Sequence, residues 1–485
     1  MPTHEVLTAS QRQQLHDIVH TLSSEDIIRY YTFSVSELRI INRRKRKTRF
    51  GFAIQFCYFR FPGRSLEEEE RVPNQLLLYV GQQLNLPTRL LRDYGQKRAE
   101  TTDDHGKDLR QAFGFLEFSE VIEQELSEWL LATALDIDDG LPLMTALLEE
   151  MRTRQIIQPA LSTLEELVWH VREQAKQARF QRLTGQLTTQ QREQIMQLLD
   201  LRKEPPVVSH LAWLREPPRE AKPINFQRLA DRLELIRTIG LPLELGQTIP
   251  YHRLQQLAEQ GERFTPQHLQ DLADTQESLA ILVAFLHSKT AALTDQALRM
   301  HDELVRQMFN TSENQQHRKL RRDAKQINRI VHLHGQIGQS IIQARADGTD
   351  LYAAIERVLP WPDYTKSVED AGQLSQGEDF DALEWVDKRY QRIRRYSPRL
   401  LEVFEFNGGP TSASLREAIV LMKQRNQKAN PGDMPLNAPT AFVPKRWEPY
   451  VIQEDGRINH RYYELCLLTE LRNSLRSGGI LWNGR

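Results

Sequence analysis

Apolar residues recur every three or four positions through most of this 485-residue chain, and this spacing is the strongest constraint on its fold. The pattern is clear in segments such as LPLMTALLEEMRTR, NFQRLADRLELIRTIG and RYYELCLLTELRNSLRSG. Such spacing places the apolar side chains on one face of a helix. Sustained alternation of apolar and polar residues is scarce. The sequence therefore predicts a mostly α protein of several helical domains, with a short β-hairpin near residues 441–463, where Asp455-Gly456 is a turn signal.

Proline and glycine mark the expected domain boundaries. The segment 204–223 holds five prolines, which cannot extend a helix, and we expect it to be a linker. Further breaks fall at FNGGPTSAS and ANPGDMPLNAPTAFVP. A length prior of about 150 residues per domain agrees with this division. The predicted parts are an N-terminal helical domain (1–100), a second helix-turn-helix-like domain (101–203), the linker (204–223), a long helical region (224–406) and a final segment (407–485).

The overall charge gives little indication of a partner, because 64 Lys and Arg residues face 65 Asp and Glu residues. A mean hydropathy of -0.56 is typical of a polar helical protein. No apolar run approaches the roughly 18 to 20 residues that a bilayer crossing requires. Cys57 and Cys466 are far apart and give no disulfide framework. We therefore expect a cytoplasmic protein in a reducing environment.

The run RRKRKTRFGF departs most from this balanced composition. A helix through SELRIINRRKRK could be capped by Ser34 or Ser36, residues 48–51 could turn, and FAIQFCYFRF could form a second helix with a packed aromatic face. This arrangement resembles a helix-turn-helix that presents cations to DNA phosphates, and the alternative is a solvated helix end. The predicted DNA contacts are basic residues within a stretch that has no acidic one: Arg39, Arg43, Arg44, Lys45, Arg46, Lys47, Arg49, Arg60 and Arg64.

A second helix-loop-helix is predicted at residues 141–180. Ser162 and Glu165 have the spacing of a capping box at the start of its second helix. The apolar residues of that helix should face inward, and its cations should share the other side. This helix could read DNA or be an ordinary amphipathic helix. Its predicted DNA contacts are Ser162, Thr163, Arg172, Lys176 and Arg179.

Two further basic clusters lie at residues 316–329 and 388–399. The first contributes Arg318, Lys319, Arg321 and Arg322 as predicted DNA contacts. The second alternates cations with Tyr390 and Tyr396, a composition suited to backbone and stacking contacts. Four separated basic clusters in a nearly neutral chain indicate a surface that follows nucleic acid.

The search for catalytic and metal-binding motifs gives no candidate. Phosphate loops, nucleophile elbows, HExxH and CxxC pairs are absent from the sequence. The acidic segment 136–140 lacks the spacing of a calcium loop, and Asp103-Asp104 has no readable partner. His332 and His334 would point apart on a helix. We predict no catalytic or metal-ligating residue.

The segment DIIRYYTFSVSELRIINRRKRKTRFGFAIQFCYFRFPGR closely resembles the N-terminal DNA-binding domain of transposases of the Tn-three family, the replicative class II transposons of bacteria. The resemblance continues in order through IIQPALSTLEELV, LADRLELIRTIGLP, AAIERVLPW, RRYSPRLLEVFEF and FVPKRWEPYVIQEDGRINHRYYELCLLTELRNSLRSG. It implies a multipart module that recognises the double-stranded terminal inverted repeats of a transposon, with dimer contacts to itself or to a full-length transposase. When bound to DNA, such a protein would be associated with the nucleoid.

The sequence departs from the family pattern after LRNSLRSG. In the family this motif leads to a ribonuclease H-like core, in which two aspartates and a glutamate hold two divalent metal ions, expected to be magnesium. Here the motif is followed by GILWNGR instead. The resemblance therefore implies a chain that binds transposon ends without that core and is inactive alone. The alternatives are a nuclease activity within these residues, or a regulatory protein that competes with or oligomerises with full-length transposase.

Overall fold

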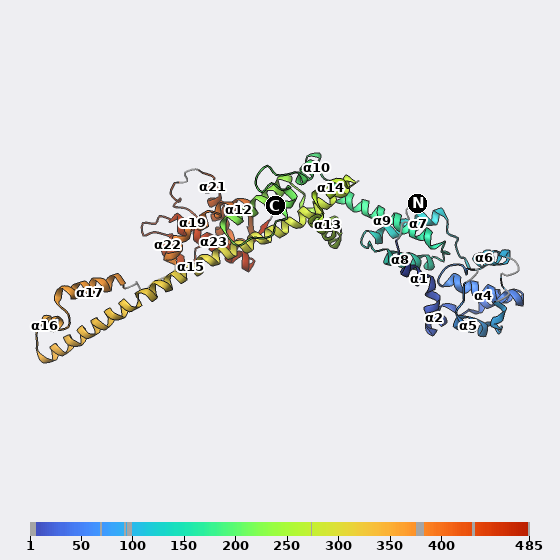
Figure 1. Ribbon diagram of the computed structural model, residues 1–485, viewed down its shortest axis with the longest axis horizontal. Helices are drawn as coiled ribbons and strands as arrows, with labels where there is room; N and C mark the ends of the chain where they lie inside the picture. The colour runs from blue at the N-terminus through green and yellow to red at the C-terminus, as the bar shows by residue number, and fades with distance from the viewer. Residues whose placement is uncertain are drawn as a thin grey trace. The chain divides into compact units, whose positions relative to one another are not determined.

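The computed structural model describes residues 6–67, 70–91, 94, 99–272, 274–374, 383–428 and 432–483. These residues are mostly helical, which confirms the predicted fold class (Figure 1). None of the helices in these ranges combines the length and apolar character needed to cross a membrane. The chain forms two compact units, one of residues 1–186 with 245–254 and one of residues 187–244 with 255–485.

The first unit contains two hydrophobic cores. One core surrounds α4 and includes Tyr31, Ile41 and Val80, and the other joins α7, α8 and α9. The helices of the first unit are α1 (Ala9–His16), α2 (Ser24–Tyr31), α3 (Val35–Asn42), α4 (Arg46–Arg60), α5 (Asn74–Leu84), α6 (Ala99–Phe113), α7 (Glu120–Ala134), α8 (Gly140–Thr153) and α9 (Leu161–Thr184). Short 3₁₀ turns lie at η1 (Asp17–Thr21) and η2 (Thr88–Leu91).

Helix α4 is the centre of the first core because it is buried on all sides. Ten consecutive residues, from Phe50 to Phe59, are buried. The ring of Phe56 stacks on that of Phe113 from α6, with centroids 4.0 Å apart. The Tyr31 hydroxyl donates to the Phe61 carbonyl oxygen at 3.0 Å. The aromatic segment that follows the basic run therefore packs as predicted.

The second unit is organised around α15, a helix of 73 residues. At 1.5 Å per residue its length is about 110 Å. The other helices of this unit are α10 (Thr189–Met196), α11 (His210–Leu214), α12 (Pro223–Ile239), α13 (Tyr251–Arg263, which begins in the first unit), α14 (Pro266–Asp271), α15 (Thr275–Asp347), α16 (Leu351–Glu356), α17 (Trp361–Leu374), α18 (Leu383–Val386), α19 (Tyr390–Arg394), α20 (Ser397–Val403), α21 (Ala413–Asn426), α22 (Glu448–Val451) and α23 (His460–Ser477).

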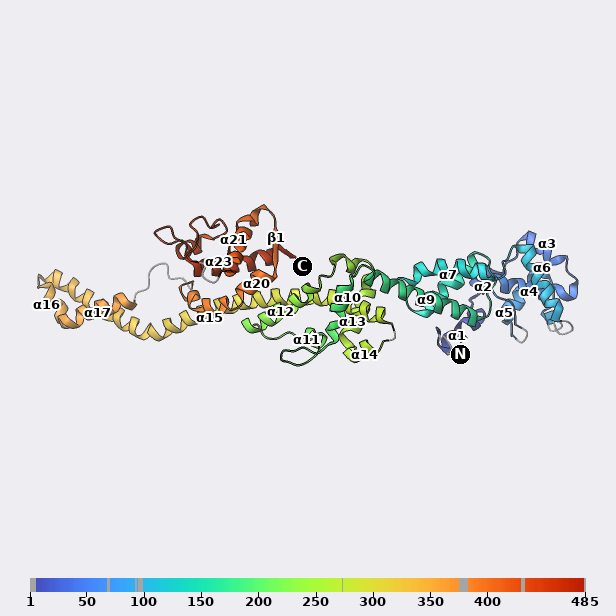
Figure 2. The ribbon, with the colours of Figure 1, turned by 90° about the horizontal axis from the view of Figure 1, so that it is seen from above.

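The two ends of α15 have different surroundings. Near its start, the side chains from Ser278 to Leu286 are all buried. Near its end, α15 contacts α16 and α17, which fold back along it (Figure 2). The Pro-rich segment 204–223, expected to be a linker, contains α11, whose Leu211, Trp213 and Leu214 are buried.

Within the described ranges, the only sheet joins β1 (Glu405–Gly408) and β2 (Ile480–Asn483) in antiparallel register. The hairpin predicted near residues 441–463 is reduced to one antiparallel bridge between Ile452 and Ile458, around the predicted turn at Asp455-Gly456. Short 3₁₀ turns complete this unit at η3 (Gln197–Leu199), η4 (Leu243–Gln247, shared with the first unit), η5 (Asp387–Arg389), η6 (Pro410–Ser412) and η7 (Lys445–Trp447).

A buried carboxylate ties α23 to α19 and α20. Glu464 is fully buried and accepts hydrogen bonds from the Tyr390 hydroxyl at 2.7 Å, the Ser397 hydroxyl at 2.5 Å and the Arg394 guanidinium at 3.1 Å. A buried charge is tolerated only when it is paired and hydrogen-bonded. This cluster therefore fixes how the three helices pack.

We expect Glu464→Ala to lower the free energy of unfolding by about 3–5 kcal/mol, because it removes the acceptor of the Tyr390 and Ser397 hydroxyls and the ion-pair partner of the half-buried Arg394. Glu402→Ala is the control, since Glu402 is exposed and pairs with Arg399 at 3.0 Å. Its loss should cost less than about 1 kcal/mol. Urea denaturation of both variants checks this, and equal losses would contradict a structural role for Glu464.

Candidate nucleic-acid interface

The two helices predicted around the basic run are present as α3 and α4. Ser34, one of the two predicted caps, accepts from the Glu37 N–H and forms a capping box with that residue. The turn lies at residues 43–45 and not at the predicted residues 48–51, because α4 begins at Arg46. Gly51, read as a turn residue, lies inside α4 against the ring of Tyr94, which a Cβ would overlap. Close packing therefore explains this glycine.

Two arginines of the basic run hold the turn in place. The Arg49 guanidinium donates to the carbonyl oxygen of Asn42 at 2.8 Å and to that of Arg44 at 3.0 Å. These carbonyls close the end of α3, where a helix lacks internal donors. Arg44 pairs with Asp108 of α6 at 2.7 Å, and its guanidinium lies 4.6 Å from the centre of the Phe52 ring. Both side chains therefore serve the fold.

Arg60 and Arg64 are also engaged within the first unit. Arg60 pairs with Glu37, donates to the Thr32 carbonyl at 2.8 Å and lies over the Phe56 ring. Arg64 donates to both carboxylate oxygens of Glu70, at 2.6 and 2.7 Å. Burial opposes the charge of Arg64, but its hydrogen bonds with Glu70 outweigh burial and raise its pKa. The structure gives these two predicted contacts internal partners.

The remaining cations of the run are exposed. Arg43, Lys45, Arg46 and Lys47 surround the turn, and Arg39 lies one turn earlier on α3. None of them makes an ion pair within the described part of the chain. The first turn of α4 holds no acidic residue, and no side chain caps it. Because the N-terminus of a helix carries a partial positive charge and free N–H groups, this turn is suited to an anion such as phosphate.

The second predicted site differs more from expectation. Helix α9 begins at Leu161, with Ala160 as its N-cap residue, so Ser162 and Thr163 lie inside its first turn and form no capping box. Glu165 instead accepts from the Leu7 N–H at 3.2 Å and pairs with Arg12 at 3.0 Å. A tertiary contact to the N-terminal segment thus replaces the local cap.

The three predicted cations of α9 each contact another group of the first unit. Arg179 is buried, and it donates to the Ala134 carbonyl at 2.9 Å and to Asp138 at 3.5 Å. Burial lowers its pKa. Arg172 lies 3.8 Å from Asp138, and Lys176 lies over the Phe180 ring. The predicted inward residues Leu164, Leu167, Val168 and Val171 are buried, as expected.

The basic cluster of α15 is largely exposed. Arg318, Arg321 and Arg322 lie on the surface, and Arg322 pairs with the neighbouring Asp323 at 3.1 Å. The Nζ atom of Lys319 lies 5.8 Å from the centre of the Trp385 ring, and that of Lys388 lies 3.9 Å from it. The structure therefore joins two clusters that the sequence separates by about 70 residues, through a tryptophan that the sequence reading did not single out.

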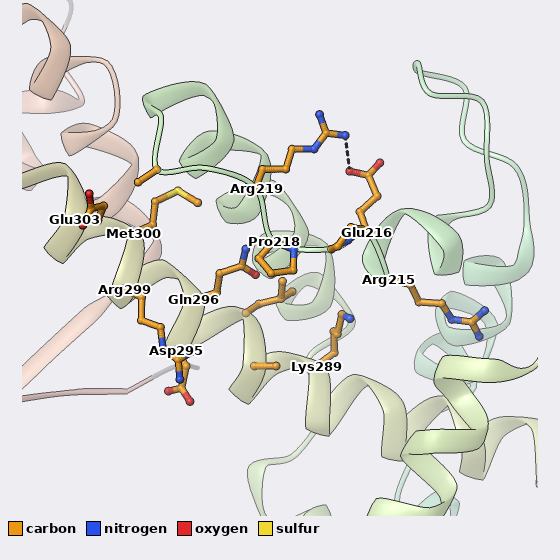
Figure 3. Close-up of a pocket in the computed structure, with 14 residues that line it drawn as sticks. Arg215, Glu216, Pro218, Arg219, Lys289, Asp295, Gln296, Arg299, Met300 and Glu303 are labelled. Carbon is orange, nitrogen blue, oxygen red and sulfur yellow. Dashed lines mark hydrogen bonds and ion pairs between the residues drawn. The ribbon is translucent and has the colours of Figure 1, made fainter. Parts of the chain in front are cut away.

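A cavity of about 600 Å³ in the second unit separates the loop that starts at Arg215 from α15 (Figure 3). Two of the cations that line it have partners: Arg219 donates to Glu216 at 3.3 Å, and Lys289 pairs with Glu262 at 2.9 Å. Across the described residues, no group of three or more histidines, cysteines and carboxylates is placed to hold a metal ion. The cavity therefore gives no reason to assign chemistry to it.

Comparisons with known proteins extend over the whole chain. The family described as a domain of unknown function (DUF4158) matches residues 6–171. The chain is 34% identical over 485 residues to the transposase for transposon Tn3926 of Escherichia coli. It is also 34% identical over 490 residues to the transposase for transposon Tn501 of Pseudomonas aeruginosa, and 32% identical over 484 residues to that for Tn1546 of Enterococcus faecium.

These alignments cover 98–100% of the chain and 48% of each relative. The chain thus spans about half the length of the curated relatives it matches. Its two compact units both fall within the aligned region. Over its whole length the chain is therefore similar to the N-terminal half of transposases of the Tn-three family.

Proposed function

We propose that this chain binds the double-stranded terminal inverted repeats of a transposon and serves DNA transposition through that binding. The observation that carries the proposal is the exposed turn between α3 and α4. There Arg43, Lys45, Arg46 and Lys47 lie together without internal partners, at the start of a buried helix. The names of the relatives, all transposases of transposons, supply the class of DNA.

Mutual repulsion of these cations favours an anionic partner. Two unit charges about 8 Å apart repel each other by about 0.5 kcal/mol in water, and four such charges form several pairs. Phosphate groups of a duplex would remove that repulsion and release counterions, a gain that dominates affinity at low salt. The arginines that could have been neutralised internally, Arg44 and Arg49, already are engaged with the protein. The exposed cations of the turn are therefore the ones available to an anionic ligand.

The burial of α4 favours contact with DNA phosphates over contact with bases. Because α4 is buried from Phe50 to Phe59, its body cannot enter a DNA groove. Only its first turn and the preceding loop reach outward. Contacts of this kind position a protein on a duplex, and other elements read the bases. We include the start of α9, where Ser162 is exposed, among the elements proposed to contact DNA.

The variant Arg46→Gln/Lys47→Gln should bind all duplexes more weakly, because it removes two phosphate contacts. The slope of log affinity against log salt should become shallower by about 1.8, at about 0.9 per contact. Fluorescence anisotropy with an inverted-repeat duplex, between 50 and 200 mM salt, measures this.

The matched control for that experiment is Lys203→Gln/Arg228→Gln, which removes two exposed cations of the second unit. Its slope should stay close to that of the unsubstituted chain. An unchanged slope in the Arg46/Lys47 variant would refute phosphate contact at the turn. Equal affinity of the unsubstituted chain for random duplex would refute the inverted repeat as its specific target.

Arg49→Lys tests whether the geometry of the turn matters beyond its charge. Lysine keeps the charge but cannot reproduce the forked hydrogen bonds to Asn42 and Arg44. We expect affinity for the inverted-repeat duplex to fall roughly three- to tenfold, about 0.7–1.4 kcal/mol, with no change in salt slope. Arg46→Lys, at an exposed position, should bind normally. Normal binding by both variants would show that the turn does not depend on Arg49.

A further inference from the structure

Helix α5 of the first unit exposes a face without charge. The sequence from Val72 to Thr88 contains no Asp, Glu, Lys or Arg. The exposed side chains of α5 and of the residue that ends it lie on one side of the helix, and they are Asn74, Gln75, Leu78, Gln82 and Asn85. Among the residues that the structure describes, none bonds to these four amide side chains. An exposed helix face normally carries charges, so a face of amides and one leucine calls for an explanation.

The other face of α5 packs against the first turns of α4, and the two helices lie side by side in both views (Figures 1 and 2). Gly81 belongs to that buried face, and a Cβ there would lie 3.7 Å from the ring of Phe50. Phe50 follows Arg46 and Lys47 by about one turn of α4. The C-terminal end of α5 therefore lies beside these two exposed cations of the α3–α4 turn.

Helix α6 lies on the opposite side of α4. The Phe52 ring meets the ring of His105 from α6 edge-on, with centroids 5.1 Å apart. Phe52 is about 200° around the helix from Phe50. Helix α6 therefore does not cover the surface that α5 shares with the turn.

Charge distinguishes the two ends of α5. Residues 67–71, shortly before its start, hold four carboxylates and one cation. Residues 86–92, just after its end, hold two arginines and no carboxylate. One of these, Arg89, is exposed in η2, which also contacts α4. A polyanion is therefore attracted to the C-terminal half of α5 and repelled from its start.

The neighbouring Gln83 fixes the rotation of α5 about its axis. Its side-chain amide accepts from the Phe33 N–H at 2.8 Å and donates to the Tyr31 carbonyl oxygen at 2.9 Å. These bonds tie α5 to the segment that enters α3. Two adjacent glutamines thus differ in their surroundings, because Gln83 is held by the protein and Gln82 points to solvent.

We infer that the C-terminal half of α5 reads A·T base pairs in the major groove of the terminal duplex, through Leu78, Gln82 and Asn85. The inference rests on the proposed DNA binding by the α3–α4 turn, and it supplies the base contacts that the turn cannot make. We call these three residues the α5 reading face.

The chemistry of the α5 reading face fits this task. An Asn or Gln side chain pairs with both the N7 acceptor and the N6 amino donor of adenine, and an apolar side chain contacts the methyl group of thymine. The major groove admits an α-helix. Neutral side chains add little to the attraction that every duplex exerts, so their contacts add sequence preference. Arg46 and Lys47 would hold the flanking phosphates while Gln82 takes an adenine.

The variant Gln82→Ala tests the reading face on the protein side. It should bind the inverted-repeat duplex at least about fivefold more weakly, while its affinity for a random duplex and its salt slope stay unchanged, because the lost contact is to a base. Asn74→Ala is the control, since Asn74 is exposed at the far end of α5 and should leave both affinities unchanged. Fluorescence anisotropy with the two duplexes measures this.

Changes in the DNA test the same contacts without altering the protein. Replacing A·T pairs by G·C pairs one at a time should reveal a pair at which the original chain loses affinity and Gln82→Ala does not. Replacing thymine by uracil removes only a methyl group. At one position it should weaken the original chain about fourfold and leave Leu78→Ala unaffected. The absence of any such position for either variant would overturn the inference.

The outcomes separate this inference from the proposed function. If Gln82→Ala keeps the full preference for the inverted repeat while Arg46→Gln/Lys47→Gln loses salt slope, α5 does not read bases and phosphate binding at the turn stands. Equal weakening of both duplexes by Gln82→Ala would also overturn base reading. A chain without preference for the inverted repeat would do the same, and the salt slope would still decide phosphate contact at the turn.

Discussion

The complete burial of α4 is the constraint on which the first unit depends. A helix with ten consecutive buried residues can carry charge only at its ends, so the cations of the basic run are forced to its N-terminal turn. Those nearest the core are matched one by one: Arg44 by Asp108, Arg49 by backbone carbonyls and Arg60 by Glu37. The unmatched cations then lie outside, where a solvent or ligand anion can reach them.

Local signals in the sequence were sufficient for much of this arrangement, and contacts distant in sequence account for the errors. The apolar spacing predicted the helices, and Ser34 could be recognised as a cap because its partner is three residues away. The turn was misplaced because Gly51 suggested a local break. Its real cause is the ring of Tyr94, more than 40 residues later, and no local pattern reveals such an approach.

At the second predicted DNA-contact site, on α9, contacts distant in sequence also decide which charged residues have partners. Ser162 and Glu165 have capping-box spacing, but Glu165 is taken by Leu7 and Arg12 from the other end of the unit. Arg179 shares a helix side with Arg172 by spacing, yet it is buried against the Ala134 carbonyl. The sequence identifies the cations, but only the packing of the folded chain decides which of them have internal partners.

The two units therefore use cations in different ways. In the first unit, partnered arginines build a rigid turn, and the exposed cations gather at one helix end. In α15, the cations Arg318, Arg322, Lys325 and Arg329 recur at spacings of four, three and four along one exposed side of the helix. Charge on α15 is therefore spread along an exposed helix side, whereas in the first unit it is concentrated at a turn that the partnered Arg49 holds in place.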